Sequence, residues 1–401
     1  MVEPRGLDPA VIDLHAVRAD TPGNHRGVFL DSAGSSLPPV QVLDEVVAHL
    51  RREAEVGGYR AATERADDLA AGYEDFARLL GCEADEVAFT DSATRSWLVA
   101  FDAIPLAPGD RILCTEAEYG GNAVPLLRRA AEVGAEVAPI PSDATGAVDV
   151  QALRTMLDER VRLVSLVHVP TNGGLVNPAA AVIEAAHEAG ALVLLDACQS
   201  AGQVDLSDLD ADIVTGTGRK WLRGPRGTGF LVVRGRIRDR LQPRQVDLHS
   251  GTWDAPDRFS LRPDARVFEL WESSVADRLG LIAAARYALA LGVPNIEAAV
   301  RSRAEHLRSG LANLPGVTIH DLGEVRCGLV TFTVDGVPPT EVRDRLADQN
   351  ITVTVSGTTS TQYDMTRRGL DLIVRASPHY FTSPAQLDKA IASVRELTRH
   401  P

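Results

Sequence analysis

Lysine is scarce in this chain of 401 residues, and so are cysteine and long apolar runs. The four cysteines, Cys82, Cys114, Cys198 and Cys327, are far apart and form no C-x-x-C or Cys/His pattern. This spacing speaks against a disulfide framework and against a structural zinc site. No apolar run approaches the length of a membrane span, and Met1 to Arg5 does not begin a signal peptide. We therefore expect a globular protein of the cytoplasm.

The balance of charge argues against some classes of partner. The formal net charge is -14, with 55 acidic against 41 basic residues. An acidic chain is repelled by nucleic acid and by anionic membrane surfaces, so we expect neither as the main partner. Apolar residues make up 45% of the chain, which is enough for the large cores of two or three domains.

Strand-like apolar runs alternate with helical stretches between residues 85 and 233. The runs are 86–89, 111–114, 162–167, 191–195, 212–214 and 229–233. Apolar strands separated by helices predict an α/β fold with a mainly parallel sheet covered on both faces. We predict an N-terminal segment (1–39), a large domain (40–292) and a smaller C-terminal α+β domain (293–401). Ligands of such sheets bind at the carboxyl ends of the strands.

The stretch from Thr215 to Phe230 places one of only two lysines between a strand and a glycine-rich turn. The other, Lys389, lies among apolar residues at helical spacing, which predicts an exposed polar face. Lys220 instead follows an apolar run and precedes Trp221, which predicts a desolvated pocket. Burial lowers the pKa of an ammonium group, so Lys220 is a candidate Schiff-base lysine for a carbonyl cofactor such as pyridoxal phosphate. By composition alone, a chance lysine in a loop is an equally good interpretation.

A carboxylate and an amide follow the strand at 192–195, upstream of this lysine. Asp196 and Gln199 leave the sheet together in the run Asp196 to Ser200. A pyridine nitrogen stays protonated only beside a carboxylate, which is the role that we predict for Asp196. Gln199 is placed to hydrogen-bond the phenolic oxygen of the same ring. In isolation, a helix N-cap is the better interpretation of Asp196.

Two segments predict a phosphate site. The run Phe89 to Ser96 indicates a strand that ends in small hydroxyl residues and continues into a helix. The N-terminus of that helix offers backbone N–H groups at Ala93 and Thr94, and Thr94 adds its hydroxyl. Thr217 and Arg219 supply a further hydroxyl and a guanidinium suited to a phosphate.

Other polar residues near these strand ends are open to two interpretations. Tyr119 lies at a strand end where an aromatic ring can stack on a planar cofactor, although a surface-loop tyrosine fits the same pattern. Tyr59 and Arg60 follow a glycine pair, which marks either a site loop or only the end of a helix. Asp91 is an unsuitable neighbour for a phosphate, so we expect it to cap the helix and point away.

With these residues laid out, the sequence resembles the class V aminotransferase fold type, which includes cysteine desulfurases and kynureninase. Three ordered motifs carry the resemblance, which extends over nearly the whole chain. They are Asp-x-x-Gln-Ser at 196–200, the lysine segment with Gly-Pro-x-Gly-x-Gly at 217–229, and Arg-x-Ser-x-x-Tyr at 375–380. The resemblance implies fold type I with a seven-stranded sheet, pyridoxal 5'-phosphate as cofactor, and a homodimer with active sites at the subunit interface. It also implies that Arg375 holds the α-carboxylate of the substrate.

The chain departs from the family pattern at several positions. Arg219 and Tyr119 each stand where the family has a histidine, and Thr171-Asn172 stands where it has a single asparagine. A threonine that reaches the phosphate of the neighbouring subunit in many members has no clear counterpart. The candidates for that role are Thr252, Ser273 and Ser274.

The segment before the last strand separates this chain from the desulfurases of the family. Those enzymes carry a persulfide-forming cysteine in a mobile loop there, whereas Val355 to Met365 contains no thiol. Persulfide chemistry is therefore not expected. Three other segments are similar to the carbon–sulfur lyase of ergothioneine biosynthesis and to its relatives in lincosamide antibiotic pathways. These segments are 55–59, 169–178 and 364–368.

We therefore predict a pyridoxal-phosphate-dependent carbon–sulfur β-lyase that cleaves an S-substituted L-cysteine to a thiol or sulfenate, pyruvate and ammonia. Lys220 is the predicted general base, while Arg375, Thr171 and Asn172 are predicted to bind the substrate. One alternative is a decarboxylation coupled to oxidative deamination, which yields an aldehyde, and weaker ones are an aminotransferase or an epimerase. A binding protein without catalysis is disfavoured because Lys220, Asp196 and Arg375 are present together.

Overall fold

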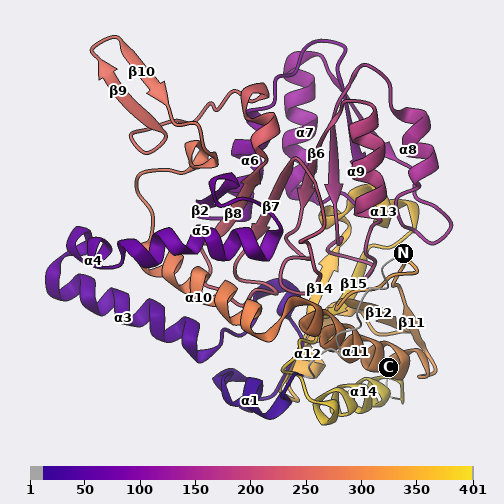
Figure 1. Ribbon diagram of the computed structural model, residues 1–401. Coiled ribbons are helices and arrows are strands. Elements are labelled where there is room, and N and C mark those ends of the chain that lie inside the picture. Colours follow the sequence, from indigo (N-terminus) through magenta and orange to yellow (C-terminus); the bar gives the residue numbers. More distant parts are fainter. Residues whose placement is uncertain (1–11, 400–401) are drawn as a thin grey trace, which may run out of the picture.

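The computed structural model describes residues 12–399, and its centre is a seven-stranded sheet in the order β2-β8-β7-β6-β5-β3-β4 (Figure 1). The strands are β2 (Val87–Thr90), β3 (Arg111–Thr115), β4 (Glu136–Ile140), β5 (Val161–Val167), β6 (Leu192–Asp196), β7 (Ile213–Thr217) and β8 (Gly229–Val233). β8 runs antiparallel to both of its neighbours, and the other six strands run in one direction. The predicted α/β fold with a mainly parallel seven-stranded sheet is confirmed.

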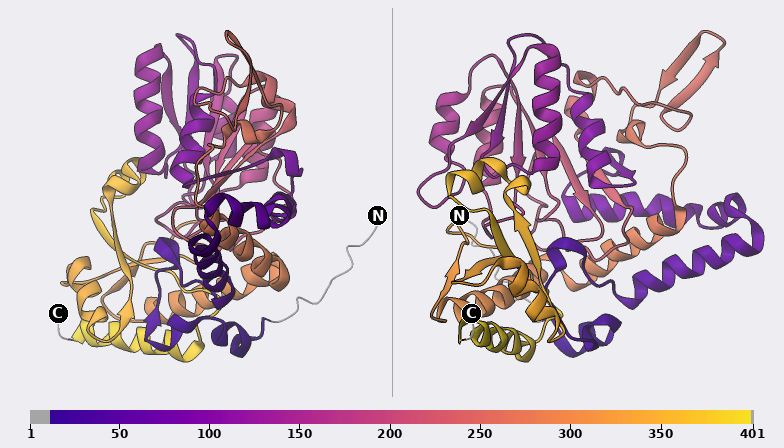
Figure 2. Two further views of the ribbon diagram at one scale, coloured as in Figure 1. Left: turned by 90° about the vertical axis from the view of Figure 1, so that its left-hand side faces the viewer. Right: turned by 180° about the vertical axis from the view of Figure 1, so that it is seen from behind.

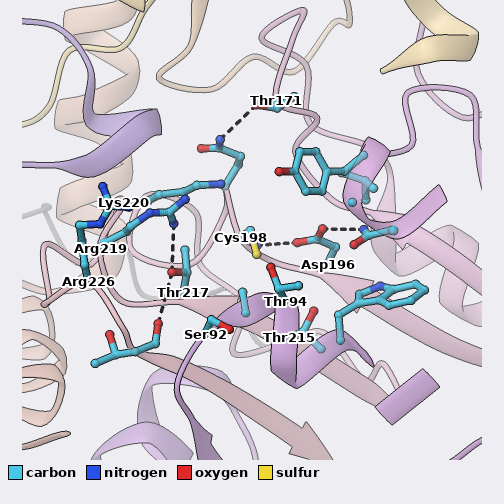
Figure 3. Close-up of a pocket in the computed structure, with 18 of the residues that line it drawn as sticks. Ser92, Thr94, Thr171, Asp196, Cys198, Thr215, Thr217, Arg219, Lys220 and Arg226 are labelled. Carbon is cyan, nitrogen blue, oxygen red and sulfur yellow. Dashed lines mark hydrogen bonds between the residues drawn. The ribbon is translucent and has the colours of Figure 1, made fainter. Parts of the chain in front are cut away.

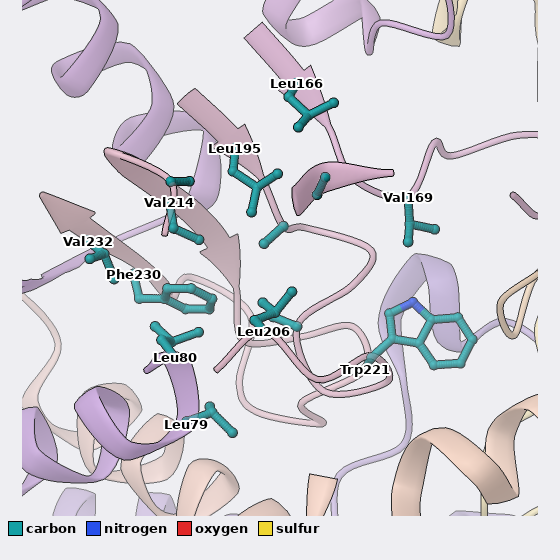
Figure 4. Packing of buried hydrophobic residues seen from close by; sticks show 14 of the residues in the cluster. Leu79, Leu80, Leu166, Val169, Leu195, Leu206, Val214, Trp221, Phe230 and Val232 are labelled. Carbon is teal, nitrogen blue, oxygen red and sulfur yellow. The ribbon is translucent and has the colours of Figure 1, made fainter. Parts of the chain in front are cut away.

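The central strands bury side chains on both faces of this sheet. In β6, Val193 and Leu195 lie in one hydrophobic core, and Leu192 and Leu194 lie in the other. This alternation follows from the two-residue repeat of a strand, and it explains the continuous apolar runs of the sequence. Figure 4 shows the first core, where Leu195 lies near Val214 and Phe230.

Helices cover both faces of the sheet. The first core receives side chains of α5 (Ala66–Leu80), α8 (Val150–Met156), α9 (Ala179–Glu188) and α10 (Val275–Leu291). The second core receives side chains of α6 (Ala93–Asp102) and α7 (Gly120–Val133). Both α6 and α7 begin at the carboxyl end of a strand, so their N-termini point toward the edge of the sheet where ligands bind.

Two parts of the chain form strands without a clear sequence signal. β4 is an edge strand in which Glu136 and Pro139 are exposed, so no continuous apolar run marks it. β9 (Gly251–Ala255) and β10 (Arg258–Leu261) form a hairpin that projects from the body of the molecule (Figures 1 and 2). Trp253 on this hairpin is 71% exposed.

The C-terminal unit is a four-stranded antiparallel sheet in the order β11-β12-β15-β14, and it packs against three helices. Its elements are α11 (Val293–Ala312), β11 (Val317–Ile319), β12 (Val330–Val334), α12 (Pro339–Ala347), β13 (Ile351–Thr352), β14 (Thr354–Gly357), η5 (Thr358–Ser360), α13 (Gln362–Arg367), β15 (Leu372–Ala376) and α14 (Pro384–Arg399). α11 follows α10 after Gly292, whose φ is +81°, with a bend of 84° between the helices. The long helical region near 273–312 is thus two helices.

The N-terminal segment packs on the C-terminal unit. β1 (Val28–Phe29) pairs in parallel with β13, and Val28 and Leu30 lie in the core of that unit. Arg18 Nη1 donates to Phe381 O at 3.0 Å. The remaining elements are α1 (Leu14–Ala19), η1 (Pro22–His25), α2 (Ser32–Ser35), η2 (Ala84–Glu86), η3 (Gly235–Arg240) and η4 (Ala265–Phe268).

Helices α3 (Val40–Val56) and α4 (Gly58–Glu64) form an arm at one side of the molecule (Figure 1). Only Gly57, with a φ of +85°, separates them, so the glycine pair ends one helix and begins the next. Tyr59 and Arg60 therefore lie on a helix, and Tyr59 is 80% exposed. No single helix within residues 12–399 is long and apolar enough to cross a membrane, although the bent pair α10–α11 passes on length and composition.

Candidate active site

The carboxyl ends of β6 and β7 border a cavity of about 270 Å³ (Figure 3). Nine residues predicted from the sequence line it: Ala93, Thr94, Tyr119, Thr171, Asp196, Gln199, Thr217, Arg219 and Lys220. Arg375 and Asn172 are not among the lining residues, and neither are Tyr59 and Arg60. Residues that lie more than 100 positions apart in the sequence thus meet at one edge of the sheet.

Tight backbone contacts hold the loop that carries Lys220. Gly224 N donates to Gly218 O at 2.8 Å, and a Cβ on Gly218 would lie only 2.3 Å from Thr228 Oγ1. The next residue, Trp221, is 1% exposed, and its Nε1 donates to Gln199 Oε1 at 2.8 Å. The glycines of the motif are therefore needed for close packing, and the tryptophan ties the lysine loop to the loop after β6.

The surroundings of Lys220 favour a neutral amine. Burial lowers the pKa of its ammonium group, and the positive charges of Arg219 and Arg375 lower it further. Cys198 and Asp196 act in the opposite direction. A neutral amine is the form that attacks a carbonyl carbon, as the sequence predicts for this residue.

Arg223 anchors the same loop to distant parts of the chain. Arg223 is 1% exposed. Its backbone φ is +64°, in the left-handed region that non-glycine residues rarely adopt. Nε donates to Leu37 O at 2.8 Å, Nη1 to Tyr380 OH at 2.7 Å and Nη2 to Thr21 Oγ1 at 2.6 Å. One buried side chain thus connects the lysine loop with the N-terminal segment and with the C-terminal unit.

Asp196 is the last residue of β6 and is 6% exposed. Its Oδ2 accepts a hydrogen bond from Asn122 Nδ2 at 2.8 Å, and its Oδ1 accepts one from Cys198 N at 2.9 Å. Figure 3 shows Asp196 and Cys198 side by side at the cavity. No helix begins after Asp196, so its carboxylate caps a turn rather than a helix.

Gln199 lies in the turn that follows. Besides accepting from Trp221, its side chain donates through Nε2 to Ala33 O at 3.1 Å and approaches Thr171 Oγ1 at 3.5 Å. These contacts fix the amide at the wall of the cavity.

The N-terminus of α6 forms another wall of the cavity. Ser92 is its N-cap and accepts from Arg95 N at 3.1 Å, so the cap is Ser92 and not Asp91, which lines the cavity. A Cβ on Gly229 would lie 2.4 Å from the carbonyl carbon of Ser92, because β8 begins directly against this helix end. The backbone N–H groups at the start of α6 are suited to an anion.

Thr217, at the end of β7, and Arg219, in the lysine loop, lie together at the cavity (Figure 3). Arg219 Nη1 donates to Thr217 Oγ1 at 3.2 Å, and both residues line the cavity together with Arg226. Tyr119 precedes α7, is 44% exposed, and has its ring over the backbone of Gly121, where a Cβ would lie 2.6 Å from Cε1.

Arg375 lies on β15 behind Thr171. Its Nη1 donates to Thr171 Oγ1 at 2.7 Å, and Nη2 is 3.5 Å from Asp31 Oδ1. The guanidinium is buried, yet its Nε has no hydrogen-bond partner in the protein. Asn172 instead donates through Nδ2 to Thr361 Oγ1 at 3.0 Å and to Met365 Sδ at 3.1 Å.

Several residues at or beside the cavity carried no sequence signal. They are Asp31, Trp97, Glu118, Asn122, Cys198 and Arg226. Glu118 and Asn122 stand four residues apart just before and within α7, a spacing that is common on any helix. Among residues 12–399, no group of three or more His, Cys, Asp or Glu side chains is arranged to hold a metal ion.

Comparison with known proteins extends these observations. The chain is 30% identical to a cysteine desulfurase of Haloferax volcanii over 96% of this chain and 98% of that protein. It is 32% identical to a probable hercynylcysteine sulfoxide lyase of Mycobacterium tuberculosis over 90% of this chain and 88% of that protein. A solved cystine C–S lyase, in complex with its product cysteine persulfide, is 26% identical with a TM-score of 0.84, covering 94% of this chain and 99% of that one.

The family model agrees with the fold and with the cavity. Residues 28–389 match the aminotransferase class-V model, which is most of the chain and includes every residue that lines the cavity. The chain therefore belongs to the class V aminotransferase family.

Proposed function

We propose that the chain is a carbon–sulfur β-lyase that acts on an S-substituted L-cysteine. Its cofactor is pyridoxal 5'-phosphate, in agreement with its family. The choice of reaction depends on the segment 354–368. A desulfurase needs a mobile thiol there, and this chain has none.

Contacts with the loops after β3 and β5 and with the start of α7 hold this segment. Besides the bond from Asn172, Arg367 Nε lies 3.2 Å from Glu116 Oε1, and a Cβ on Gly120 would lie 2.3 Å from Thr359 O. The segment contains no cysteine. A fixed loop without a thiol has no means of carrying sulfur away from the cavity, and this supports elimination of the sulfur group instead.

The thiol that does line the cavity is poorly suited to replace the missing one. Burial raises the pKa of the Cys198 thiol, and the charge of Asp196 raises it further. The thiolate is the nucleophilic form of cysteine, so Cys198 stays unreactive at neutral pH. The other cysteines, Cys82, Cys114 and Cys327, do not line the cavity.

The residues of the cavity fit the cofactor. Thr215 Oγ1 and Trp97 Nε1 are buried polar atoms without partners in the protein, and both residues line the cavity. The start of α6, with Thr94, Thr217 and Arg219, offers donors for a phosphate. Asp196 offers a carboxylate for a ring nitrogen. When bound, the cofactor withdraws electrons from the Cα atom of an amino-acid substrate.

The proposed reaction uses three side chains. Arg375 binds the α-carboxylate, and its unpartnered Nε and its long 3.5 Å approach to Asp31 support a missing anionic partner. Lys220 takes the proton from Cα as a neutral amine. The bond between Cβ and sulfur then breaks, the leaving sulfur keeps the electron pair, and the remaining three-carbon fragment hydrolyses to pyruvate and ammonia. Thr171 positions Arg375 through the 2.7 Å bond.

We further propose a homodimer whose partner completes the site. The hairpin β9–β10 carries Trp253 and Phe259, which are 71% and 65% exposed, and Thr252 lies on the same hairpin. A second cavity, lined by Asp91, Thr228 and Ser273, adjoins the first on the side of α6. The projection of the hairpin from the body of the molecule supports Thr252 as the residue that reaches the neighbouring phosphate. A Trp253→Ser/Phe259→Ser variant is expected to be monomeric in light scattering, and an unchanged dimer would contradict the proposal. A cytoplasmic location stays a prediction.

Product analysis tests the proposed reaction. The enzyme is incubated under air with L-cysteine, a hercynylcysteine sulfoxide and a sugar-linked cysteine thioether, with Lys220→Ala as the control. Pyruvate and ammonia in equal amounts, with a free thiol or sulfenate, are the expected products. Alanine from L-cysteine would establish a desulfurase instead. Carbon dioxide with an aldehyde and peroxide would establish the decarboxylating alternative.

A further inference from the structure

A second carboxylate lies behind Asp196, away from the cavity. Glu118 follows β3, is 1% exposed, and does not line the cavity. It follows the strand by three residues and is placed by its backbone, because Glu118 N donates to Thr115 O at 3.1 Å. The proposed reaction gives this buried acid no role.

One amide connects the two carboxylates. Asn122 Nδ2 donates to Glu118 Oε1 at 3.0 Å and to Asp196 Oδ2 at 2.8 Å. Asn122 is itself 5% exposed and belongs to the first turn of α7. Both hydrogens of its Nδ2 are therefore used, one for each acid, and the orientation of the Asp196 carboxylate depends on where Glu118 holds the amide.

The side chain of Glu118 is hydrogen-bonded through both of its oxygens. Its Oε1 accepts from Tyr119 N at 2.9 Å and from Asn122 Nδ2 at 3.0 Å, and its Oε2 accepts from the hydroxyl of Ser165 at 3.0 Å. A hydroxyl oxygen can accept, so a proton on Oε2 has a partner there.

The electrostatics point the same way. Burial raises the pKa of Glu118 to about 8 and the charge of Asp196 acts in the same direction, and together they outweigh the hydrogen bonds from Asn122, Ser165 and Tyr119 N, which lower it. Glu118 also acts on the pKa of Cys114 on β3 and of Tyr363 on α13, and neither of these groups supplies a positive charge.

We propose that Glu118 and Asn122 are positioning residues for the cofactor: Glu118 acts as a neutral carboxylic acid that holds Asn122, and Asn122 holds Asp196 against the ring nitrogen. Two charged carboxylates joined by one neutral amide repel each other in a buried site, so Asp196 carries the charge alone. The proposal rests on the cofactor assignment but not on which substrate bond breaks. Cofactor binding therefore tests it separately from the product analysis.

The test compares variants by cofactor binding rather than by activity. Glu118→Ala and Asn122→Leu remove the two links, Glu118→Gln keeps the shape without ionising, and Glu132→Gln changes an exposed glutamate of α7 as a matched control. The measurements are the dissociation constant of pyridoxal 5'-phosphate and the visible absorbance of the bound cofactor as a function of pH. Circular dichroism verifies that each variant is folded.

Glu118→Ala and Asn122→Leu are expected to weaken cofactor binding at least about tenfold, the size of effect that the loss of an outer-shell partner has at a metal site. Glu118→Gln is expected to bind within about threefold of the parent, and to lose a spectral transition near pH 8 that the parent and Glu132→Gln share. The proposal is overturned if Glu118→Ala keeps the affinity and spectrum of the parent. If Glu118→Ala does not fold, the proposal is overturned by a spectral transition near pH 8 that remains in Glu118→Gln.

Discussion

Replacing Glu118 by glutamine is expected to change how the stability of the cofactor-free protein depends on pH. In the folded chain Glu118 keeps its proton up to a pKa of about 8, whereas the same group in an unfolded chain releases it near 4.5. Between these values the folded state binds more protons than the unfolded state, so the free energy of unfolding falls as pH rises. Glutamine has no such proton, and Glu118→Gln therefore loses less stability over this range.

The size of the effect follows from the two pKa values. Each unit between them corresponds to about 1.4 kcal/mol, so the full range is worth roughly 5 kcal/mol as an upper limit. Relaxation of the site on ionisation reduces this, and we expect the difference between parent and variant to change by at least about 2 kcal/mol from about pH 5 to about pH 9. Below about pH 4.5 both states are protonated and the group has no effect.

Urea unfolding followed by circular dichroism at a series of pH values measures this difference. The other ionisable groups are the same in both chains, so their contributions cancel in the comparison. Glu132→Gln, on the exposed side of α7, is expected to follow the parent at every pH. A difference between parent and Glu118→Gln that stays constant within about 0.5 kcal/mol across the range would refute a neutral, buried Glu118.

Three further changes test the site and its support. Lys220→Ala is expected to abolish both turnover and the visible absorbance of the bound cofactor, whereas Lys389→Ala, the other lysine of the chain, leaves both unchanged in spectra and assays. Arg375→Ala is expected to raise KM at least about tenfold with a smaller effect on kcat, because it removes a charge-assisted bond to the substrate. Steady-state kinetics measure both constants, and an equal fall in kcat and kcat/KM would contradict this role. Arg223→Ala is expected to lower the free energy of unfolding by about 3 kcal/mol or more, since two buried acceptors and one partly buried acceptor lose their donor. Arg226→Ala, on the exposed part of the same loop, is expected to change it by less than about 1 kcal/mol in urea unfolding.

The sequence predicts the central sheet well, because buried parallel strands require continuous apolar runs. The positions of Lys220 and Asp196 follow from the same pattern, since each stands where an apolar run ends. The edge strand β4 is not predicted because Glu136 and Pro139 face solvent and interrupt its apolar run. The hairpin β9–β10 is not predicted because most of its side chains are exposed and form no apolar run, as the exposure of Trp253 illustrates.

The finer arrangement of the site depends on contacts between distant segments, which local patterns do not encode. Asn172 adjoins Thr171 in the sequence, yet Thr171 lines the cavity and Asn172 contacts the segment before β15. Likewise, Ser92 and Asp91 are both good N-cap residues by type, and the structure has Ser92 in that place, where β8 packs against the helix end. Glu118 acquires its role from Asn122 and Asp196, which no spacing rule connects.

The pairing of β1 with β13 joins two segments that are synthesised far apart in time. The two strands are separated by roughly 320 residues, which a ribosome adds in about 16 to 64 seconds. Before β13 is made, Val28 and Leu30 lack their core. Tyr380, which contacts Arg223 together with Thr21 and Leu37, is made later still. A nascent chain thus has all the residues that line the cavity before the lysine loop has its third tether.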